Sequence, residues 1–454
     1  MEAVFSEAGY QGLIQDIFGR FPSVQKEGFT AGAYKPGLER MQAFDEALGF
    51  PSRQLNAIHI AGTNGKGSVA NMLASACKAS GLKTGLFTSP HLLDFRERMR
   101  IDGEMIDKEY VFAFLNRWMN WIVAHELSFF EITTGLAFRW FADRQTDVAV
   151  IETGLGGRLD STNILEHPRL AIVTSIGLDH CDLLGHTPEA IAGEKAGIFK
   201  RGVPALVGES TPETAPVFEE RAWMFCPLTY ADKVKPALWP HHTALLQQMD
   251  LQARVQAKNL RTVLAAVDIL REQPLFRCLQ DATVEDGIVH TAAYMDFHGR
   301  WERLSSQPYV VADIGHNAHA LQHNFTQLQQ LVQDGQFSSL IIVYGIMADK
   351  DLDAILPLMP GNATYIFTAP ATPRALRAEA ILERFNAFRA AHGGSSTRSY
   401  AFTAVRQAVQ MAVQLSQQLS RQLSRSASAQ QPAPPLIYIG GSTFVVAEAL
   451  PLFK

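Results

Sequence analysis

The chain has 454 residues, of which 47% are hydrophobic and 19% are charged, and this composition excludes disorder as its dominant state. Its length predicts about two or three domains. The formal net charge of −5 argues against a general nucleic-acid binder, because binding to a phosphate backbone requires an excess of basic residues. Four cysteines lie far apart without a C-x-x-C pair, which argues against a disulfide framework and against a zinc site made of thiolates.

The N-terminal residues show no basic region followed by an apolar one, so we expect no signal peptide. No apolar run reaches the length of about 18 residues that a membrane-spanning helix needs. We therefore expect a soluble, cytoplasmic protein with reduced cysteines and no membrane partner.

In the first half, short apolar runs alternate with longer helical patterns, as in βα units around a mostly parallel sheet. Strands are predicted at 57–61, 84–88, 148–153, 171–175 and 205–207. Helices are predicted at 68–80, 108–125, 131–144 and 188–199. The third of these helices is apolar on nearly every side, which predicts that it is buried.

The pattern weakens between 211 and 250, helical character returns at 253–271, and a second alternation begins at 309. This second alternation predicts a helix at 318–332 and strands at 309–313, 340–343, 364–368 and 436–440. We predict an α/β protein of two domains, 1–296 and 297–454. The first is expected to be a P-loop-type domain with a mostly parallel sheet, and the second a smaller Rossmann-like α/β domain.

A biased stretch near the C-terminus carries Leu415, Leu419 and Leu423 at a spacing of four residues, which places them on one helix face. Prolines from Pro432 onward end that helix before the last strand. We expect a surface helix with a polar tail, because three leucines are too few for a coiled coil.

The predicted strand at 57–61 leads into Gly-Thr-Asn-Gly-Lys-Gly-Ser at 62–68 and then into a helix. In this layout, backbone N–H groups and a helix N-terminus can hold a phosphate chain, and Lys66 would reach the terminal phosphates. The strict pattern of a phosphate-binding loop is not met, because Ile60 occupies its first glycine position and Gly67 follows the lysine. The loop alone is moderate evidence, and a plain strand-to-helix turn is the alternative.

A second apolar strand ends in Glu152, at the sheet edge where ligands of open α/β sheets bind, and a carboxylate there suits Mg²⁺. The glycine-rich segment 154–160 is no dinucleotide fingerprint, because Leu159 replaces its third glycine and no helix pattern follows. His180 and the pair Glu194-Lys195 are weak signals by themselves, since a lone histidine is usually structural and a Glu-Lys pair is usually solvated.

Taken together, these motifs resemble those of folylpolyglutamate synthases, a branch of the Mur-ligase-like ATP-dependent amide synthases. The resemblance rests on the order and approximate spacing of the segments 62–68, 88–92, 152–160, 178–180 and 194–198, and it continues at 299–300, 313–319 and 440–442. Lys-Gly-Ser in the loop is similar to the folate branch, whereas the peptidoglycan branch carries Lys-Thr-Thr. The segment 313–319 reads Asp-Ile-Gly-His-Asn-Ala-His, which departs from the family pattern only in its local turn.

The resemblance implies a ligase that adds L-glutamate to folates and to dihydropteroate, with ATP converting the acceptor carboxylate into an acyl phosphate. Two anions must meet in that step, so positioning and electrostatics are the main catalytic terms. Lys66, Lys195 and His180 are implied as catalytic residues. Two Mg²⁺ ions are implied, the first held by Ser89, Glu152 and ATP oxygens and the second contacted by His180. The enzyme is expected to act as a monomer.

Lys195 matches the family position that carries a carbamate formed with CO₂. This modification would turn an ammonium group into an anion that can ligate Mg²⁺. An unmodified, cationic Lys195 bound to phosphate is the alternative, which the sequence does not exclude.

The resemblance also implies the substrate-binding residues. ATP is assigned to Gly62, Thr63, Asn64, Gly65, Lys66, Gly67, Ser68, Asn259, Arg300, Asp313 and His316. Within this set, Asn259 is expected near the adenine, Arg300 at the phosphates and Asp313 at the ribose, and closure of the two domains would complete the site. A linker cation paired at the domain boundary is the alternative for Arg300.

The folate site is implied at Ser128, Phe129, Phe130, Glu131, Leu159, Asp160 and Ser161. An aromatic pair is more often part of a core than a ligand platform, so a structural role for Phe129 and Phe130 stays open. Arg98 is the candidate for the carboxylate of the incoming glutamate, because a guanidinium group fits a carboxylate with two hydrogen bonds. Arg96 and Arg100 are the alternatives.

Three other functions remain as alternatives. A peptidoglycan-precursor ligase would carry Lys-Thr after the loop glycine. A P-loop NTPase without ligase activity would not need the second domain with its Asp/His loop. A silent family member that only binds ligands would have no reason to keep Lys66, Glu152, His180 and Lys195.

Overall fold

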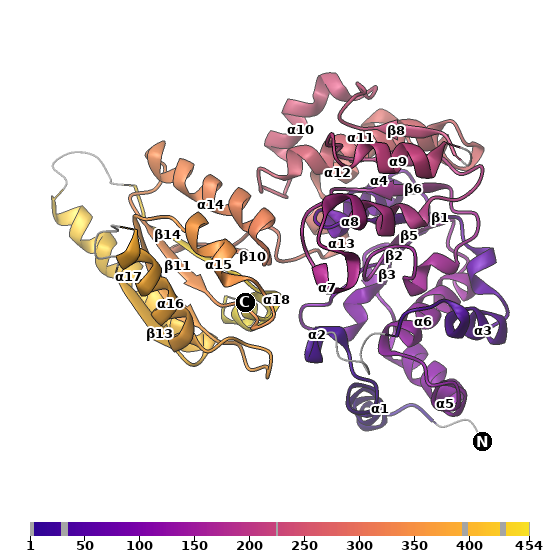
Figure 1. Ribbon diagram of the computed structural model, residues 1–454, viewed down its shortest axis with the longest axis horizontal. Coiled ribbons are helices and arrows are strands. Elements are labelled where there is room, and N and C mark those ends of the chain that lie inside the picture. Colours follow the sequence, from indigo (N-terminus) through magenta and orange to yellow (C-terminus); the bar gives the residue numbers. More distant parts are fainter. Residues whose placement is uncertain (1–3, 29–34, 224–225, 393–397, 427–432, 454) are drawn as a thin grey trace. The chain divides into compact units, whose positions relative to one another are not determined.

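The computed structural model describes residues 4–28, 35–223, 226–392, 398–426 and 433–453, which form two compact units (Figure 1). The first unit comprises Met1–Asp250 and Gln256–Phe297, and the second comprises Leu251–Val255 and His298–Lys454. The main division thus falls between Phe297 and His298. The short segment Leu251–Val255 belongs to the second unit, which the sequence pattern did not indicate.

The first unit is built on an eight-stranded sheet in the order β4-β3-β2-β5-β1-β6-β7-β8. Its strands are β1 (Ala57–Ala61), β2 (Thr84–Phe87), β3 (Met99–Ile101), β4 (Glu104–Met105), β5 (Val148–Glu152), β6 (Leu170–Val173), β7 (Ala205–Val207) and β8 (Leu228–Tyr230). The strands from β2 to β8 along this order run parallel, whereas β3 and β4 add an antiparallel edge. The ends of β5 and β6 therefore flank the end of β1.

Thirteen described helices belong to this unit. They are α1 (Glu7–Arg20), α2 (Val24–Glu27), α3 (Glu39–Ala47), α4 (Lys66–Ala79), α5 (Lys108–Ala124), α6 (Phe129–Asp143), α7 (Cys181–Leu184), α8 (Pro188–Lys195), α9 (Ala215–Ala222), α10 (His242–Gln248), α11 (Gln256–Arg271), α12 (Asp281–Val289) and α13 (Thr291–Met295). Two short 3₁₀ turns also matter for the site, η3 (Ser161–Ile164) and η4 (Ala196–Ile198).

The central strands are buried on both faces, as their continuous apolar runs predict. Successive side chains of β1 point to opposite faces of the sheet. Ala57 and Ala61, four residues apart, therefore point to the same face, where Ala57 joins the core that includes Leu136 of α6 and Ala61 joins the cluster that includes Ala192 of α8. The prediction that the helix over 131–144 is buried is confirmed, since α6 is embedded in this core over most of its length.

The second unit has a six-stranded sheet in the order β13-β12-β11-β14-β10-β9. Its strands are β9 (Glu302–Ser306), β10 (Tyr309–Asp313), β11 (Leu340–Tyr344), β12 (Ala363–Thr368), β13 (Ser399–Phe402) and β14 (Leu436–Gly440). Its helices are α14 (Ala318–Gln333), α15 (Leu352–Ile355), α16 (Ala378–Ala391), α17 (Val405–Ser426) and α18 (Thr443–Ala449). The edge strand β9 is antiparallel to β10, and the other neighbouring pairs are parallel.

The mixed α/β fold class predicted from the sequence is confirmed in both units. The leucine-bearing stretch near the C-terminus is helical as predicted, and Leu415, Leu419 and Leu423 are half-buried on α17. The predicted polar tail falls partly on 427–432, outside the described residues. Helices in the part of the chain that is described are too short or too polar to cross a membrane.

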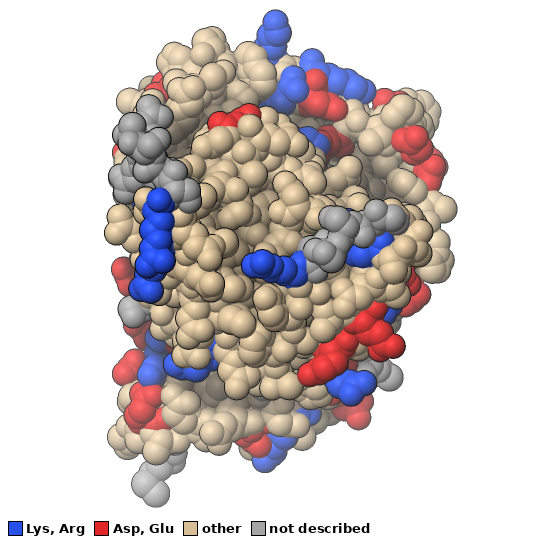
Figure 2. All heavy atoms as spheres, turned by 90° about the vertical axis from the view of Figure 1, so that its left-hand side faces the viewer, with Lys and Arg blue, Asp and Glu red and all other residues tan. Residues whose placement is uncertain are grey.

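The surface shown in Figure 2 carries scattered side chains of both charges around a broad uncharged area. Lys and Arg do not dominate this face, and acidic side chains lie mainly near its margins (Figure 2).

Candidate active site

The glycine-rich loop joins β1 to the N-terminus of α4, and two of its glycines are required by geometry. Gly65 caps α4 with a φ of +86°, a left-handed conformation that side chains with a Cβ rarely adopt. A Cβ at Gly65 would also overlap Asn259 Oδ1, and a Cβ at Gly62 would overlap Thr174 Oγ1. The loop therefore packs directly against α11 and against the end of β6.

Hydrogen bonds fix this loop to the segment that follows β6. The Thr63 N–H donates to the Ser175 carbonyl at 2.8 Å, and the Thr63 hydroxyl donates to the Gly177 carbonyl at 3.0 Å. Thr174 Oγ1 donates to the Asn64 carbonyl at 2.7 Å. A loop held on both sides in this way is preorganised, with the N-terminus of the 14-residue helix α4 directly behind it.

Two lysines that are distant in the sequence meet at this loop. Lys66 Nζ and Lys195 Nζ each donate to the Gly62 carbonyl at 2.9 Å, and Lys66 Nζ also donates to the Thr63 carbonyl at 3.2 Å. Lys195 is buried, and burial together with the neighbouring charge of Lys66 lowers its pKa to about 7. Its amine is therefore substantially neutral near physiological pH, which suits a nucleophile.

Glu152 ends β5 beside β1, with its side chain almost completely buried. Its carboxylate accepts the Ser89 N–H at 3.3 Å, which brings the two predicted metal ligands from neighbouring strand ends together. A buried carboxylate next to a hydroxyl side chain is an oxygen donor set that fits Mg²⁺, which commonly keeps water and phosphate oxygens as its other ligands.

His180 lies at the start of α7 with a φ of +54°. The ring nitrogen Nε2 of His180 is 3.8 Å from Asp179 Oδ2. The backbone N–H of His180 donates to Asp179 Oδ1 at 3.0 Å. Within the described ranges, no three His, Cys, Asp or Glu side chains converge on one metal position.

A buried amide side chain, which the sequence did not indicate, connects α11 to the glycine-rich loop 62–68. Gln256 accepts a hydrogen bond from Asn259 Nδ2 at 2.7 Å and donates to Ser68 Oγ at 3.2 Å. Both amides are buried. Asn259 is thus placed at the loop, as its predicted role in nucleotide binding requires, and Gln256 orients it. No local motif marks Gln256, because its contacts join segments far apart in the sequence.

The predicted folate segment forms the start of α6. Ser128 Oγ accepts the Glu131 N–H at 3.2 Å, while the Glu131 carboxylate accepts the Ser128 N–H at 2.6 Å, so the two residues form a capping box. Arg40 Nε donates to the same carboxylate at 3.1 Å. Ser128 and Glu131 therefore have a structural role at this helix end.

The aromatic pair that follows Ser128 divides between core and loop. Phe129 is buried and stacks on Phe18 with ring centres 5.2 Å apart. Phe130 is half-buried, and its ring lies so close to Gly154 that an added Cβ there would be 2.6 Å from the ring. Phe129 is thus a core residue, whereas Phe130 packs against the loop that follows β5.

In the loop 154–160, Leu159 and the adjoining Ser161 are half-buried, while Asp160 is buried. The Asp160 carboxylate accepts the backbone N–H of Leu155 at 2.8 Å and that of Thr162 at 3.0 Å. Burial raises the pKa of Asp160, and these donors oppose that rise. The Asp160 carboxylate therefore stabilises the conformation of its own loop.

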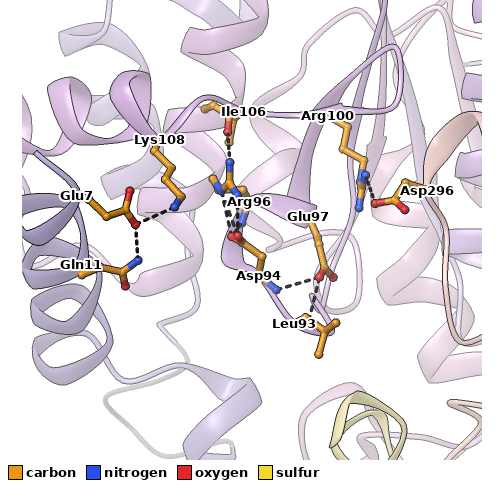
Figure 3. Close-up of polar contacts among 10 residues, drawn as sticks. All are labelled: Glu7, Gln11, Leu93, Asp94, Arg96, Glu97, Arg100, Ile106, Lys108 and Asp296. Atoms are coloured by element: carbon orange, nitrogen blue, oxygen red, sulfur yellow. Dashed lines mark hydrogen bonds and ion pairs between the residues drawn. The ribbon is translucent and has the colours of Figure 1, made fainter. Parts of the chain in front are cut away.

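The three arginines considered for glutamate all have polar partners within the first unit. Arg98 is buried over the Phe129 ring and donates to His91 Nδ1 at 2.9 Å and to Gln25 Oε1 at 2.7 Å. Arg96 pairs with Asp94 at 2.8 Å, and Arg100 pairs with Asp296 at 3.0 Å. Both pairs are drawn in Figure 3. Burial lowers the pKa of Arg98 to about 10, and the charge of Glu152 opposes this shift.

In the second unit, Asp313 ends β10 and its buried carboxylate binds the chain around it. It accepts the N–H of Trp301 at 2.9 Å, the N–H of Gly315 at 2.8 Å and the Asn324 side-chain amide at 2.7 Å. Burial raises its pKa, and the Arg300 guanidinium is the largest opposing influence. Asp313 therefore joins the turn that carries Arg300 to the loop that carries His316.

His316 is half-buried in that loop, and its Nδ1 donates to the Ile314 carbonyl at 3.1 Å. The next residue, Asn317, caps α14 by accepting the Ala320 N–H at 2.9 Å. The changed turn of this motif is therefore compatible with a regular helix start.

Each of the two units contains a match to a known protein family domain. The chain matches the Mur ligase middle domain over residues 60–207 and the glutamate ligase domain of Mur ligases over residues 299–421. It is 34% identical over 354 residues to the dihydrofolate synthase/folylpolyglutamate synthase of Escherichia coli, a match that covers 76% of this chain and 81% of the relative.

Solved structures of related enzymes are similar over almost the whole chain. Mycobacterium tuberculosis folylpolyglutamate synthase, complexed with ADP and AMPPCP, has a TM-score of 0.79 at 28% identity, with 99% of both chains covered. The bifunctional enzyme of Yersinia pestis, complexed with AMPPNP and a Mn ion, has a TM-score of 0.72 at 28% identity, with 94% of this chain and 95% of that chain covered. The chain therefore belongs to the folylpolyglutamate synthase/dihydrofolate synthase family of Mur-ligase-like proteins.

Proposed function

We propose that this protein is an ATP-dependent ligase that adds L-glutamate to folates and to dihydropteroate through an acyl phosphate. The proposal rests on one observation: Lys66 and Lys195 both donate hydrogen bonds to the Gly62 carbonyl, in the first residue of the glycine-rich loop. The buried carboxylate of Glu152 ends the neighbouring strand. The family membership and the double name of the E. coli relative support both acceptor substrates.

In the first chemical step, a carboxylate oxygen of the acceptor bonds to the γ-phosphorus of ATP, the bond to the β-phosphate oxygen breaks, and ADP leaves. The glutamate amine then attacks the acyl carbon, phosphate leaves, and the amine loses a proton. Because the acyl phosphate is hydrolysable, the site must exclude water while it exists. This sequence of bond changes requires stabilisation of negative charge on the transferred phosphoryl group.

For the nucleotide, the N–H groups of the loop 62–68 and the N-terminus of α4 would hold the phosphates. Lys66 would exchange its carbonyl partners for the terminal phosphates. Asn259, next to the loop, remains the proposed adenine contact, with Arg300, Asp313 and His316 as proposed nucleotide residues of the second unit. Since the carboxylate of Asp313 already accepts three donors, it can serve the nucleotide also by holding the Arg300 turn in place.

The donors of the first unit fit a divalent cation, with Ser89 and Glu152 proposed at one Mg²⁺ and His180 at a second. A divalent cation held there would supply positive charge that offsets the charge of the phosphates. The chain's own contribution is to place the buried Glu152 carboxylate at the strand end, where its charge raises the pKa of Arg98 against the effect of burial.

Lys195 is proposed to carry a carbamate. Its neutral amine would attack CO₂, a nitrogen–carbon bond would form, and one proton would leave to solvent. The lowered pKa of Lys195, about 7, supports this step because the neutral amine is the reactive form.

Phe130, Leu159 and Asp160 with the adjoining Ser161 are proposed to border the folate pocket, with Ser128, Phe129 and Glu131 supporting it from the start of α6. Arg98 remains the proposed glutamate contact. Its buried position and its bonds to His91 and Gln25 require that a glutamate carboxylate displace one of these partners.

The test is ADP release by the purified protein with dihydropteroate or tetrahydrofolate, each with and without L-glutamate, with product masses measured in parallel. ADP release that requires both the acceptor and glutamate, with a product one glutamyl unit heavier, supports the proposal. Release that ignores glutamate would indicate an NTPase. Release only with a muramyl-peptide acceptor would indicate a peptidoglycan ligase.

The variant Glu152→Gln sharpens this test because it removes one charge without changing the side-chain volume much. We expect kcat to fall by a factor of about 100 or more, as is typical when a group that organises transition-state charge is lost. Glu166→Gln is the matched control, since Glu166 is 61% exposed and lies in a surface pair with Arg53. Equal activity of the two variants would contradict the role of Glu152.

A further inference from the structure

A buried chain of three side chains connects the central strand β1 to the loop that follows β5. His59 lies in the middle of β1, fully buried, with Nε2 2.8 Å from Thr162 Oγ1. Thr162, also fully buried, donates its hydroxyl proton to Asp160 Oδ1 at 2.5 Å. The His59-Thr162-Asp160 chain runs across η3 and ends at the loop 154–160.

The direction of the protons in this chain follows from its acidic end. Asp160 accepts the N–H groups of Leu155 and Thr162 as well as the Thr162 hydroxyl, and these donors oppose the rise in its pKa that burial causes. Thr162 has one hydroxyl proton, which goes to Asp160, so its oxygen must accept from His59. His59 is therefore the neutral tautomer with its proton on Nε2.

A histidine at this buried position lowers the stability of the fold compared with an aliphatic side chain of similar volume. Burial lowers the pKa of His59 to about 3, so the ring stays neutral. Its other nitrogen, Nδ1, is buried and has no hydrogen-bond partner in the part of the chain that is described. An unpaired buried nitrogen costs free energy that an aliphatic side chain of similar volume would avoid. The compensating property of the imidazole is its rigid, correctly placed Nε2–H donor.

The loop held by this chain lies directly against the residues that carry the proposed chemistry. A Cβ at Gly157 would be 2.8 Å from the carbonyl oxygens of Glu194 and Lys195, so the loop backbone touches the end of α8. The Arg158 N–H donates to the Glu194 carbonyl at 2.8 Å. Displacement of the loop would therefore displace Lys195 on one side and Leu159 on the other.

We infer that His59 and Thr162 are positioning residues for the folate pocket and for Lys195, acting through Asp160 on the loop 154–160. The inference rests on the proposed function, because it assigns these residues an effect on that reaction. Neither side chain needs to contact a substrate. The Nε2–H of His59 orients the Thr162 hydroxyl, and the hydroxyl in turn keeps Asp160 bonded to its own loop.

The first test compares Thr162→Val, which removes the hydroxyl at nearly constant volume, with Thr162→Ser, which keeps it. We expect Thr162→Val to raise the KM for dihydropteroate or tetrahydrofolate about tenfold, the factor that corresponds to loss of one hydrogen bond. The KM for ATP should change less than about twofold, because Thr63 and Asn64 of the loop 62–68 are bonded to the segment 174–177, which lies outside the loop 154–160. Thr162→Ser should retain wild-type values.

A second pair tests His59. Gln can present an N–H donor at the distance of Nε2, whereas Met has a similar length without a donor, so His59→Gln should preserve the folate KM and His59→Met should raise it. Hydrogen exchange gives a readout that does not depend on activity. Exchange in peptides covering 153–165 should accelerate in Thr162→Val and His59→Met, and stay at the wild-type rate in Thr162→Ser and His59→Gln.

The outcomes separate this inference from the proposed function. A wild-type enzyme without glutamate-dependent ADP release would refute the proposed function, whatever the variants show. An active wild-type enzyme in which Thr162→Val behaves like Thr162→Ser would refute the positioning role. Equal increases of all substrate KM values with a lower melting temperature in every variant would also refute it, because they would indicate general loss of packing.

Discussion

Lys195 shows how a single side chain can trade stability for reactivity. Its pKa in the folded protein is about 7, against about 10.4 for a lysine in an unfolded chain. The unfolded state therefore binds more protons than the folded state between these two values, so the contribution of Lys195 to stability becomes less unfavourable as the pH rises through this window. Below about pH 7 the full cost of burying the amine is present. This loss of stability occurs at a position next to the glycine-rich loop 62–68.

The first prediction follows from the protonation of this amine. The neutral form of Lys195 should increase from about one tenth at pH 6 to about nine tenths at pH 8, so carbamate formation and ligase activity should rise over the same range. Enzyme depleted of CO₂ should be reactivated by bicarbonate at pH 8 more than at pH 6. The measurement is initial ADP release with and without added bicarbonate.

Lys195→Arg is the control for this prediction, because it keeps a positive charge that does not titrate in this range. We expect it to lose about 100-fold or more of kcat and to show no response to bicarbonate. Full activity of Lys195→Arg, or a wild-type enzyme indifferent to CO₂ at every pH, would show that Lys195 acts as a simple cation.

Individual site residues differ in how far the sequence could indicate them. Lys66 and Glu152 could be predicted because each follows a recognisable buried strand, and the ends of parallel strands meet at one edge. Gln256 and Gln25 could not, since their only distinguishing feature is a hydrogen bond to a residue far away in the chain. The same holds for His59, which in the sequence is one polar residue inside an apolar strand.

At the scale of an element, the turn into α4 depends on a glycine for two separate reasons, and the second prediction distinguishes them. Gly65→Ala should pay about 1 kcal/mol for its left-handed backbone and should also push Asn259 away from the loop. The KM for ATP should rise about tenfold or more. Steady-state kinetics and thermal unfolding measure the two effects.

Gly81→Ala provides the matched control. Gly81 follows the other end of α4 with a φ of +85°, and a Cβ there would meet nothing within 4 Å. Gly81→Ala should lose the same stability through its left-handed backbone and leave the KM for ATP unchanged. If both variants weaken ATP binding equally, backbone strain in α4 and not crowding of Asn259 is responsible.

The start of α6 gives the third prediction. Ser128→Ala removes a helix cap and should cost about 1 kcal/mol, which lowers the melting temperature by a few degrees. Because the same turn carries Phe129 and Phe130, the KM for the folate substrate should rise several-fold. Ser6→Ala removes the equivalent bond at the start of α1 and should leave this KM unchanged. A larger kinetic effect from Ser6→Ala would contradict the proposed position of the folate pocket.

Among the elements, the central strands were predictable because both of their faces are buried, which leaves a continuous apolar run. The strands at or next to the sheet edges were not predicted, since they are short or partly exposed; they are β3, β4, β8, β9 and β13. The capping role of Ser128 and Glu131 was also missed, although their spacing is that of a capping box.

For the whole molecule, the path of the chain between the two units was the least predictable feature. The chain leaves the first unit after Asp250, contributes Leu251–Val255 to the second, and returns with α11. The side chain of Gln327 holds this segment, because it accepts the Arg254 N–H at 2.8 Å and donates to the Gln252 carbonyl at 3.2 Å. No local pattern could reveal the excursion, since its partners lie more than seventy residues away.

The fourth prediction concerns this crossing. Gln327→Ala removes both bonds from a buried amide and should destabilise the second unit by about 2 kcal/mol, with faster hydrogen exchange at 251–255. Gln330→Ala lies on the same helix and removes only an exposed bond to Asp334, so its effect should stay below about 0.5 kcal/mol. Unchanged exchange at 251–255 in Gln327→Ala would mean that apolar contacts alone, such as those of Ala253, hold the segment. A selective increase would instead show that one buried glutamine fixes the point at which the chain passes between its two folding units.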